Sequence, residues 1–262
     1  MEKASKIYSE HINNFKVAII MNNLTDREFW RNYWNNYHYK KIKSTLFFDK
    51  YLDDKILCQN DCEFIEIGGF PGEMSIYFRK KYNCKVTLLD FYIDKTIINN
   101  LETENGLPIN TIKFIESDFF QFNATKYYNF VFSYGFIEHF EDTKDVIERH
   151  INLAKKGGEI FIILPNFRGI NGWFQYLFDR NNYNIHNINS MKICVLNDIM
   201  NSIDLKDYII TYVGKPMIWL APKNTLTNKI FRPFVKLLSY FIKLFPIRSR
   251  LLSPYIIIKA TK

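Results

Sequence analysis

Cysteine is scarce in this chain of 262 residues, and its placement excludes two classes of protein. The four cysteines, Cys58, Cys62, Cys84 and Cys194, form no C-x-x-C pair. Disulfide-rich secreted domains and structural zinc domains both depend on closely spaced cysteine pairs, and Cys58 and Cys62 have no histidine nearby. We therefore expect a protein of the reducing cytoplasm.

Internal repeats, low-complexity segments and the apolar core of a signal peptide are also missing. Hydrophobic residues make up 47% of the chain, which is enough to bury the core of a full domain. Asparagine, isoleucine and lysine are used heavily, as is typical of AT-rich bacterial genomes. These features predict a soluble bacterial protein without a targeting segment.

Glycine is scarce as well, with ten residues, yet three of them lie in the stretch Glu66–Gly72 (EIGGFPG). A short apolar run precedes this stretch, and a segment compatible with a helix follows it. Glycines let the backbone approach a ligand, and the free N–H groups of a helix N-terminus attract electron-rich atoms. The order of strand, glycine turn and helix predicts a binding site for part of a nucleotide.

Asp90 supports this interpretation, because it ends a second apolar run, Lys85–Asp90. It lies 22 positions after Gly68 (90 − 68), close to the offset of ~20 residues at which an acid meets ribose hydroxyls in nucleotide-binding α/β folds. A carboxylate suits this task because it accepts two hydroxyl hydrogens at once.

The pattern E-x-G-x-x-x-G at Glu66–Gly72 resembles the first motif of the class I S-adenosylmethionine (SAM)-dependent methyltransferases. Ile112–Phe119 resembles the third motif of that family, in which an acid takes the adenine amino group and an apolar neighbour covers the ring. Phe130–Phe140 resembles the fourth-strand segment of many of its small-molecule enzymes, often written S-x-G-V-L-E-H. The resemblance covers roughly residues 40–220 and the last strand.

This resemblance implies SAM as the cofactor and S-adenosylhomocysteine (SAH) as the product. It also implies the residues that contact the cofactor: Glu66, Gly68, Gly69, Gly72, Asp90, Phe91, Ser117, Asp118, Phe119, Ser133, Tyr134 and Gly135. Because these positions include three acids in register, a binding protein that kept the fold but lost catalysis is the less favoured alternative.

The rest of the chain predicts a Rossmann-like, doubly wound α/β fold. Lys155–Gly158 is expected to end a helix, and further strands are expected at Glu159–Leu164, Tyr208–Tyr212 and Pro254–Ala260. Alternating strands and helices favour a parallel sheet covered on both faces. The resemblance implies seven strands, mostly parallel, with an antiparallel last strand, N-terminal helices and a helical insertion before that strand.

Residues 1–50 are predicted to be a helical segment outside the sheet domain, which then spans residues 51–262. Aromatic residues recur at helical spacing from Phe29 to Tyr39. One interpretation is a helix that packs its rings on the domain. The other is a lid over cofactor and acceptor, whose rings attract the positive sulfonium.

Charge of one sign is missing from the last part of the chain. From Tyr208 to Lys262 there are seven Lys and three Arg and no Asp or Glu, so this part carries +10 and the preceding residues carry −2. Lys229, Arg232, Lys236 and Lys243 share one side of a predicted amphipathic helix within an insertion at about 223–252. Phe231, Phe234, Leu238, Phe241 and Phe245 lie on the other side, with Pro233 in the first turn.

Four interpretations of this helix remain open. It packs on the domain with solvated lysines, it lies on a membrane surface, it caps an anionic acceptor, or it contacts nucleic acid. Nucleic acid is disfavoured, because no recognised binding module accompanies the charge and Ser133–Phe136 is not the D/N-P-P-Y/F of base methyltransferases. The second interpretation implies peripheral contact with the inner membrane face.

Two histidines are the candidate catalytic bases, since histidine is the side chain that most simply takes a proton near pH 7. His139 follows the fourth strand, and His186 lies in the long link after the fifth strand. Glu138 is a third candidate, with a structural role as the favoured interpretation. The sequence shows no convincing cluster of metal ligands, so we expect no metal.

The loop after the fifth strand, Leu164–Gln175, supplies candidate acceptor contacts in Asn166, Arg168 and Trp173. Amides, one Arg and a Trp suit a polar or anionic small molecule better than a lipid tail. This loop and the His186 segment resemble methyltransferases of bacterial surface-polysaccharide loci. The resemblance implies O-methylation of a sugar, nucleotide-linked or phosphate/phosphoramidate-type precursor of a capsule, with a lipid-linked acceptor at the membrane as the alternative.

Overall fold

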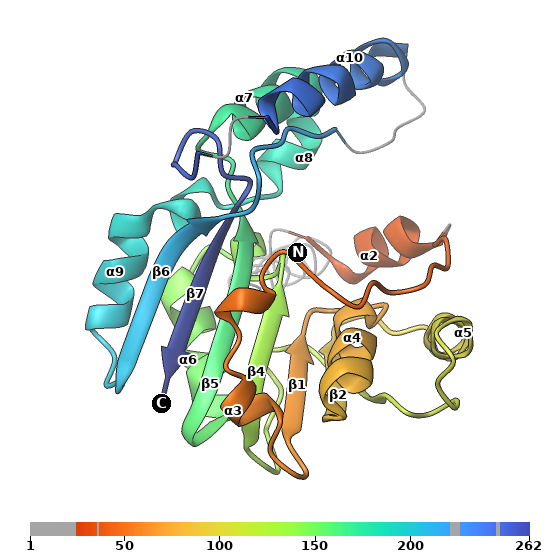
Figure 1. Cartoon of the computed structure of the whole chain (residues 1–262), viewed down its shortest axis with the longest axis vertical. Coiled ribbons are helices and arrows are strands. Elements are labelled where there is room, and N and C mark those ends of the chain that lie inside the picture. The colour runs from red at the N-terminus through yellow and green to blue at the C-terminus, as the bar shows by residue number, and fades with distance from the viewer. Residues whose placement is uncertain (1–24, 36, 221–225, 245–246) are drawn as a thin grey trace, which may run out of the picture.

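The protein folds around one seven-stranded sheet in the order β3-β2-β1-β4-β5-β7-β6 (Figure 1). The computed structural model describes residues 25–35, 37–220, 226–244 and 247–262. Six strands run parallel and β7 runs antiparallel to its neighbours β5 and β6. The predicted doubly wound fold with an antiparallel last strand is therefore confirmed. The strands are β1 (Glu63–Ile67), β2 (Lys85–Asp90), β3 (Lys113–Glu116), β4 (Tyr128–Tyr134), β5 (Ala154–Pro165), β6 (Asp207–Val213) and β7 (Tyr255–Thr261).

Helices cover both faces of the sheet. One face packs against α3 (Asp54–Leu57), α4 (Glu73–Tyr82) and α5 (Lys95–Glu104), and the other packs against α6 (Thr143–Leu153) and α9 (Ile193–Asn201). The remaining elements lie beyond the carboxyl ends of the parallel strands or beside them (Figure 1). They are α2 (Arg27–Trp34), η2 (Ile137–His139), α7 (Ile170–Phe178), α8 (Arg180–Asn184), η3 (Ile188–Met191) and α10 (Leu226–Ile242). The short helix η1 (Asp49–Tyr51) instead packs on the face that α3 and α4 cover.

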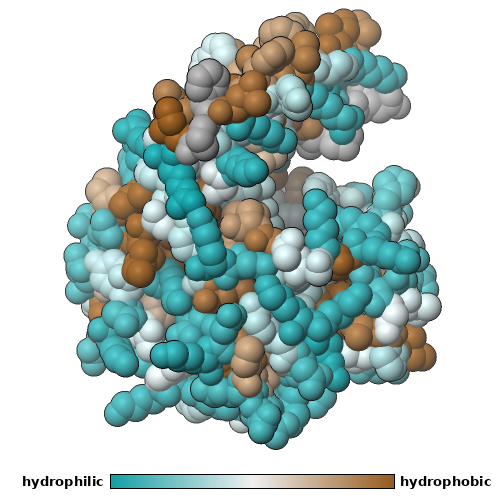
Figure 2. Space-filling model, in the orientation of Figure 1, coloured by the Kyte–Doolittle hydropathy of each residue, from teal (hydrophilic) through white to brown (hydrophobic). Residues whose placement is uncertain are grey.

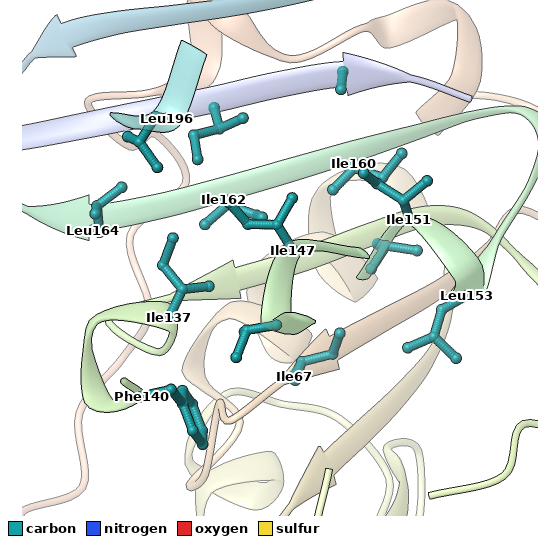
Figure 3. Close-up of a cluster of buried hydrophobic side chains, with 14 of the residues drawn as sticks. Ile67, Ile137, Phe140, Ile147, Ile151, Leu153, Ile160, Ile162, Leu164 and Leu196 are labelled. Carbon is teal, nitrogen blue, oxygen red and sulfur yellow. The ribbon is translucent and has the colours of Figure 1, made fainter. Parts of the chain in front are cut away.

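The two faces of the sheet bury different side chains because strand residues alternate between faces. In β4 and β5, Phe130, Phe132 and Phe161 lie on the face covered by α4 and contact one another. The rings of Phe130 and Phe132 also contact Phe64 of β1 and Phe78 of α4. The intervening residues form an aliphatic cluster with α6 and α9, which Figure 3 shows around Ile147 and Ile162. The high phenylalanine content thus builds one layer of the core.

Two expected helices differ from the structure. Of the predicted helical segment 1–50, residues 1–24 and 36 lie outside the described residues, and residues 37–48 form no helix. Helix α2 ends at Trp34, because the segment after it hydrogen-bonds elsewhere: the Ile42 N–H donates to Asn105 and the Asn105 amide donates to the Lys40 carbonyl. Helix α6 ends at Leu153, and Lys155–Gly158 belongs to β5. There the register between β4 and β5 shifts, which accommodates Gly157 with its positive φ of 75°.

The predicted helical insertion contains α10, although residues 221–225 and 245–246 lie outside the described residues. Pro233 lies inside the helix rather than in its first turn, since α10 is already formed at Leu226. The helix packs on α7 through a face that includes Val235 and Ser239. The predicted aromatic side is only partly covered. Phe231 packs against Phe178 with ring centroids 4.6 Å apart, whereas Phe234 and Phe241 are exposed, away from the packed face.

None of the helices in the described part of the chain is both long enough and apolar enough to cross a bilayer.

Candidate active site

The glycine turn after β1 is held in place by a buried carboxylate. Glu66 lies at the end of β1, and its Oε2 accepts hydrogen bonds from the Ser75 N–H at 2.7 Å and the Ser75 hydroxyl at 2.6 Å. Burial raises the pKa of Glu66 to about 8. A Cβ on Gly69 would lie 2.1 Å from this carboxyl group, so the turn closes over Glu66 only with glycine at this position.

Gly68 and Gly72 meet a second requirement, because both have positive φ, at 63° and 96°. Gly72 is the N-cap of α4 in left-handed conformation. Gly68 also packs against the Phe136 ring, and a Cβ there would lie 1.9 Å from a ring carbon. The turn therefore depends on glycine both for its conformation and for close contact.

Replacing Gly68 by alanine should destabilise the fold more than the same change at Gly106. Both glycines have positive φ, which costs alanine about 1–2 kcal/mol. At Gly68 the new methyl group would clash with the Phe136 ring, whereas at Gly106 no atom lies within 4 Å of the added Cβ. Overpacking adds about 1–3 kcal/mol to the loss in the free energy of unfolding. Urea denaturation of both variants measures the difference, and equal losses would contradict the close contact.

Asp90 lies at the end of β2, beside the glycine turn. Its two carboxylate oxygens accept hydrogen bonds from the N–H groups of Phe70 and Tyr92, at 2.9 and 3.1 Å. Burial raises the pKa of Asp90 to about 6, despite these hydrogen bonds. Asp90 lines two cavities at this edge of the sheet.

A narrow pocket lies on one side of Asp90. Ser117, Asp118 and Phe119, which follow β3, line it together with Gly68 and Phe91. The Ser117 N–H donates to the Asp90 carbonyl at 2.9 Å, so the segment after β3 is tied to the end of β2. The residues with the predicted adenine contacts are thus brought together at the carboxyl edge of the sheet.

A larger cavity of about 610 Å³ also has Asp90 in its lining and reaches the glycine turn. Helix α2 and the segment after it form one wall, and the ends of β4, β5 and β7 form another. Tyr134 and Gly135, two of the residues expected to contact the cofactor, lie in this lining. The aromatic side chains that line the cavity include Trp30, Trp34, Tyr37, Phe167, Trp219 and Tyr255.

Glu138, His139 and His186 meet in this cavity. One potential ligand atom from each lies within 4.8 Å of the others, and the two imidazole centroids are 4.7 Å apart. Burial lowers the pKa of His139 to about 3 and that of His186 to about 4, and it raises the pKa of Glu138 to about 8. Both imidazoles are therefore neutral at pH 7 and carry a free lone pair.

Five of the residues predicted to bind cofactor or acceptor do not line either cavity. Gly72 is the N-cap of α4 and faces the side chains of Ile112 and Leu88. Ser133 is buried with its hydroxyl 3.0 Å from Nε2 of His150. The Asn166 amide donates to the carbonyls of Arg250 and Ser253. Arg168 and Trp173 lie outside the cavity, and Trp173 is 57% exposed on α7. The loop Leu164–Gln175 thus supports the segment before β7, and of its residues Pro165 and Phe167 line the cavity.

Sequence reasoning missed several polar and aromatic residues of the cavity wall. Tyr37 donates a hydrogen bond to Glu73 at 2.8 Å, and Lys40 forms an ion pair with the same carboxylate at 2.8 Å. Trp219 and Tyr255 stack with centroids 5.8 Å apart. The aromatic spacing from Phe29 to Tyr39 was the one available signal, and it indicated the correct segment.

The comparison with protein families matches residues 33–207 to the model described as a methyltransferase domain. The chain belongs to this methyltransferase family. The match spans more than half of the chain and includes β1 to β5, the glycine turn and both histidines. A search of curated protein sequences finds no match.

Solved structures similar to this methyltransferase share its class I fold. A SAM-dependent methyltransferase from Archaeoglobus fulgidus aligns with a TM-score of 0.52 and 17% identity, over 82% of this chain and 91% of that chain. The plantazolicin methyltransferase BpumL with SAH aligns with a TM-score of 0.53 and 14% identity, over 98% of this chain and 99% of that chain. Phosphoethanolamine N-methyltransferase 2 of Haemonchus contortus aligns at 0.55 and 13% identity, over 78% of this chain and 49% of that chain.

The cofactor expected from the sequence motifs agrees with these findings, since SAH or SAM is bound in several of the similar structures. Their named substrates differ, however, and include an alkaloid-type amine and a phosphoethanolamine. The fold and family are therefore settled, and the acceptor of this methyltransferase is a separate question.

Proposed function

We propose that this methyltransferase transfers a methyl group from SAM to an oxygen of a small polar acceptor. The supporting observation is the position of the 610 Å³ cavity, which joins the glycine turn and Asp90 to the pair His139 and His186. In this proposal the adenosine lies between Asp90 and Asp118, and the sulfonium points past the turn into the cavity. Helix α2 acts as a lid over both ligands.

The lining of the cavity favours a sugar or another polyhydroxylated compound as acceptor. Aromatic rings offer apolar faces for the C–H groups of a sugar ring, and Lys40, Glu73 and Asn182 offer polar contacts at the wall. With the resemblance of the His186 segment to polysaccharide-locus enzymes, this lining supports a capsule or surface-polysaccharide precursor. Sugars, nucleotide-linked sugars, and phosphate or phosphoramidate groups are the candidate acceptors.

The chemistry requires alignment of the acceptor and removal of one proton. An oxygen lone pair of the acceptor attacks the methyl carbon, the C–S bond breaks, and its electron pair stays on sulfur to give SAH. The hydroxyl proton leaves to a base, for which the Nε2 lone pairs of His139 and His186 are the groups at hand. The cofactor supplies the reactive methyl group, and the protein supplies position and proton removal.

Two measurements test this proposal in sequence. Calorimetric titration with SAH should show binding, and no binding by folded protein would overturn the cofactor assignment. Incubation with SAM carrying a labelled methyl group, in the presence of nucleotide-linked sugars and sugar phosphates, should then yield a labelled product. Label transfer to amines alone would contradict an oxygen acceptor.

A lipid-linked acceptor is a second candidate, and the exposed stripe on α10 favours it. The stripe consists of apolar residues that share one side of α10 and its C-terminal end and are 53–65% exposed: Ile230, Phe234, Leu237, Phe241 and Leu244. This stripe lies opposite the face that packs on α7. Figure 2 shows apolar residues gathered over these helices at the top of the molecule. Such a stripe is what a helix in the membrane interface presents to lipid.

The charge beside the stripe supports an anionic membrane as the proposed occupant. Lys229, Lys236 and Lys243 recur every seven residues along one flank of the apolar stripe and are exposed. Because the segment from Tyr208 onward contains no acid, a second copy of the same surface would be repelled. Anionic lipid headgroups complement this arrangement, and each Lys near such a surface contributes ~1 kcal/mol.

We predict that the protein sediments with vesicles of phosphatidylglycerol and phosphatidylcholine, and only weakly with phosphatidylcholine alone. The double change Phe234→Gln and Phe241→Gln should abolish binding, because it removes the apolar contact. The double change Lys236→Gln and Lys243→Gln should weaken binding about 10–30-fold, from the loss of ~2 kcal/mol.

Ile109→Gln is the matched control, since Ile109 is 59% exposed and lies in the loop before β3, away from α10. This variant should sediment like the unchanged protein. Absence of binding by the unchanged protein at moderate salt would end the membrane hypothesis. Formation of a dimer that depends on Phe234 and Phe241 would point instead to a second copy.

A further inference from the structure

Three potential ligand atoms converge in the cavity, one each from Glu138, His139 and His186. Glu138 and His139 are adjacent on η2, directly after β4, and His186 follows α8. Glu138 is 1% exposed, and its Oε2 is buried with no hydrogen-bond partner in the described part of the chain. A buried carboxylate oxygen without a partner carries a large cost in free energy unless a cation or a proton meets it.

The backbone fixes the tautomers of both histidines. Nδ1 of His139 lies 3.0 Å from the Ile185 carbonyl, and Nδ1 of His186 lies 2.6 Å from the Asn182 carbonyl. A carbonyl only accepts, so each Nδ1 carries the hydrogen and each Nε2 carries the lone pair. Histidine ligands of metals are held in this way, by an N–H donated to a carbonyl or carboxylate behind the ring.

Backbone hydrogen bonds hold the two segments of the cluster together. The Asn187 N–H donates to the Glu138 carbonyl at 2.6 Å, and the Asn187 amide donates to the carbonyls of Phe140 and Glu141. The Trp30 ring makes an edge-to-face contact with His139, with ring centroids 5.3 Å apart. The centroid of the Phe167 ring lies 4.7 Å from that of His186. The cluster is thus pre-arranged in an aromatic surrounding that limits access of water.

We propose that Glu138, His139 and His186 bind one divalent cation of the Zn²⁺, Fe²⁺, Mn²⁺ and Co²⁺ class. Two imidazoles and one carboxylate are a ligand set for these ions, whereas Mg²⁺ prefers oxygen ligands alone. Ligands at about 2.0–2.2 Å from an ion lie ~3–3.5 Å apart, so small side-chain rotations close the cluster around it. Three protein ligands leave positions open toward the cavity, as in catalytic metal sites.

The role of the ion rests on the proposed methyl transfer, whereas its binding does not. An acceptor hydroxyl on an open position would be oriented toward the methyl group, and its pKa would fall as that of metal-bound water does. The hydroxyl proton then leaves to water, the oxygen lone pair attacks the methyl carbon, and the C–S electron pair stays on sulfur. The imidazole lone pairs are occupied by the ion in this arrangement, so the histidines act as ligands instead of bases.

Titration of chelator-treated full-length protein with Co²⁺ and with Zn²⁺ tests the site independently of activity. Calorimetry should show a single site, and Co²⁺ should develop the intense visible absorption of four- or five-coordinate ions with nitrogen ligands. Glu138→Gln keeps the size of the side chain but removes its charge, and it should weaken binding at least tenfold. His186→Ala should abolish the Co²⁺ absorption.

His38→Ala is the matched control, because His38 is exposed and does not line the cavity. It should bind Co²⁺ as the unchanged protein does. SAH titration of every variant shows that the cofactor half remains folded. Binding of SAH without binding of either ion would overturn the metal site and leave the histidines as bases. Binding of an ion without SAH would support the site and remove the proposed function.

Discussion

Replacing Asp90 by alanine should weaken SAH binding by about 100-fold. The carboxylate is the proposed acceptor for the two ribose hydroxyls, and a hydrogen bond to a charged group contributes about 1.5–3 kcal/mol. Loss of ~3 kcal/mol in total corresponds to this factor. Calorimetric titration of the variant and of the unchanged protein measures it. Asp198→Ala, which removes an exposed carboxylate on α9, should bind SAH normally.

The raised pKa of Asp90 adds a pH dependence to this result. Only the ionised carboxylate accepts both hydroxyl hydrogens, and burial raises its pKa to about 6 in the ligand-free protein. The affinity for SAH should therefore be highest above pH 6 and fall about tenfold per pH unit below pH 6, because protonation of Asp90 competes with ribose binding. Asp90→Asn has no such proton and should show a flat profile. A flat profile in the unchanged protein would contradict the contact.

His186→Ala should lower the turnover number by about 100-fold or more while SAH affinity stays unchanged. Proton removal by a positioned side chain contributes about 10²–10⁴-fold, and loss of a metal ligand has an effect of similar size. The labelled-methyl assay, run with an acceptor found by the screen of nucleotide-linked sugars and sugar phosphates, measures the turnover. His38→Ala should retain full activity, since His38 lies outside the cavity.

His139→Ala provides a second measure of the same pair. Its ring also anchors the Ile185 carbonyl, so this variant should lose turnover together with some stability of the link after α8. His186→Ala keeps that anchor, because the hydrogen bond of His186 runs within its own segment to Asn182. Unchanged turnover in the His186 variant would remove this residue from the reaction, whether as base or as ligand.

The cofactor half of the site could be predicted from sequence because it is local. Each of its parts lies in a short segment: the turn after β1, Asp90 at the end of β2, and Asp118 after β3. The carboxyl ends of neighbouring parallel strands meet at one edge of a sheet, so the order of motifs already gives their arrangement. The spacing of the glycines was sufficient to place the turn.

The acceptor half was predicted less well, because its walls come from distant parts of the chain. Asn166, Arg168 and Trp173 were predicted as acceptor contacts from their chemical type. The Asn166 amide instead donates hydrogen bonds to carbonyls of the segment before β7. Lys40 and Trp219 reach the cavity only through tertiary packing, which leaves no local pattern. The meeting of Glu138 with His186 likewise depends on how the link after β5 folds back.

Helix α10 shows how periodicity misleads when two faces are apolar. The sequence shows one basic side and one aromatic side, and burial of the aromatic side is the ordinary outcome. In the structure, Val235 and Ser239 make the packed face, and Phe234 and Phe241 remain outside. A hydrophobic pattern predicts which side of a helix is apolar, but it does not predict which partner covers that side.

The position of β7 has a consequence for the synthesis of this protein on the ribosome. β7 lies between β5 and β6, and it is the neighbour through which β6 joins the sheet in the described part of the chain. When residues up to β6 have emerged, β1 to β5 and the cofactor half can already assemble. β6 cannot yet join the sheet, because its neighbour β7 has not been synthesised. Tyr255, which begins β7, is also a wall of the acceptor cavity. A nascent chain should therefore acquire affinity for SAH before it can hold an acceptor.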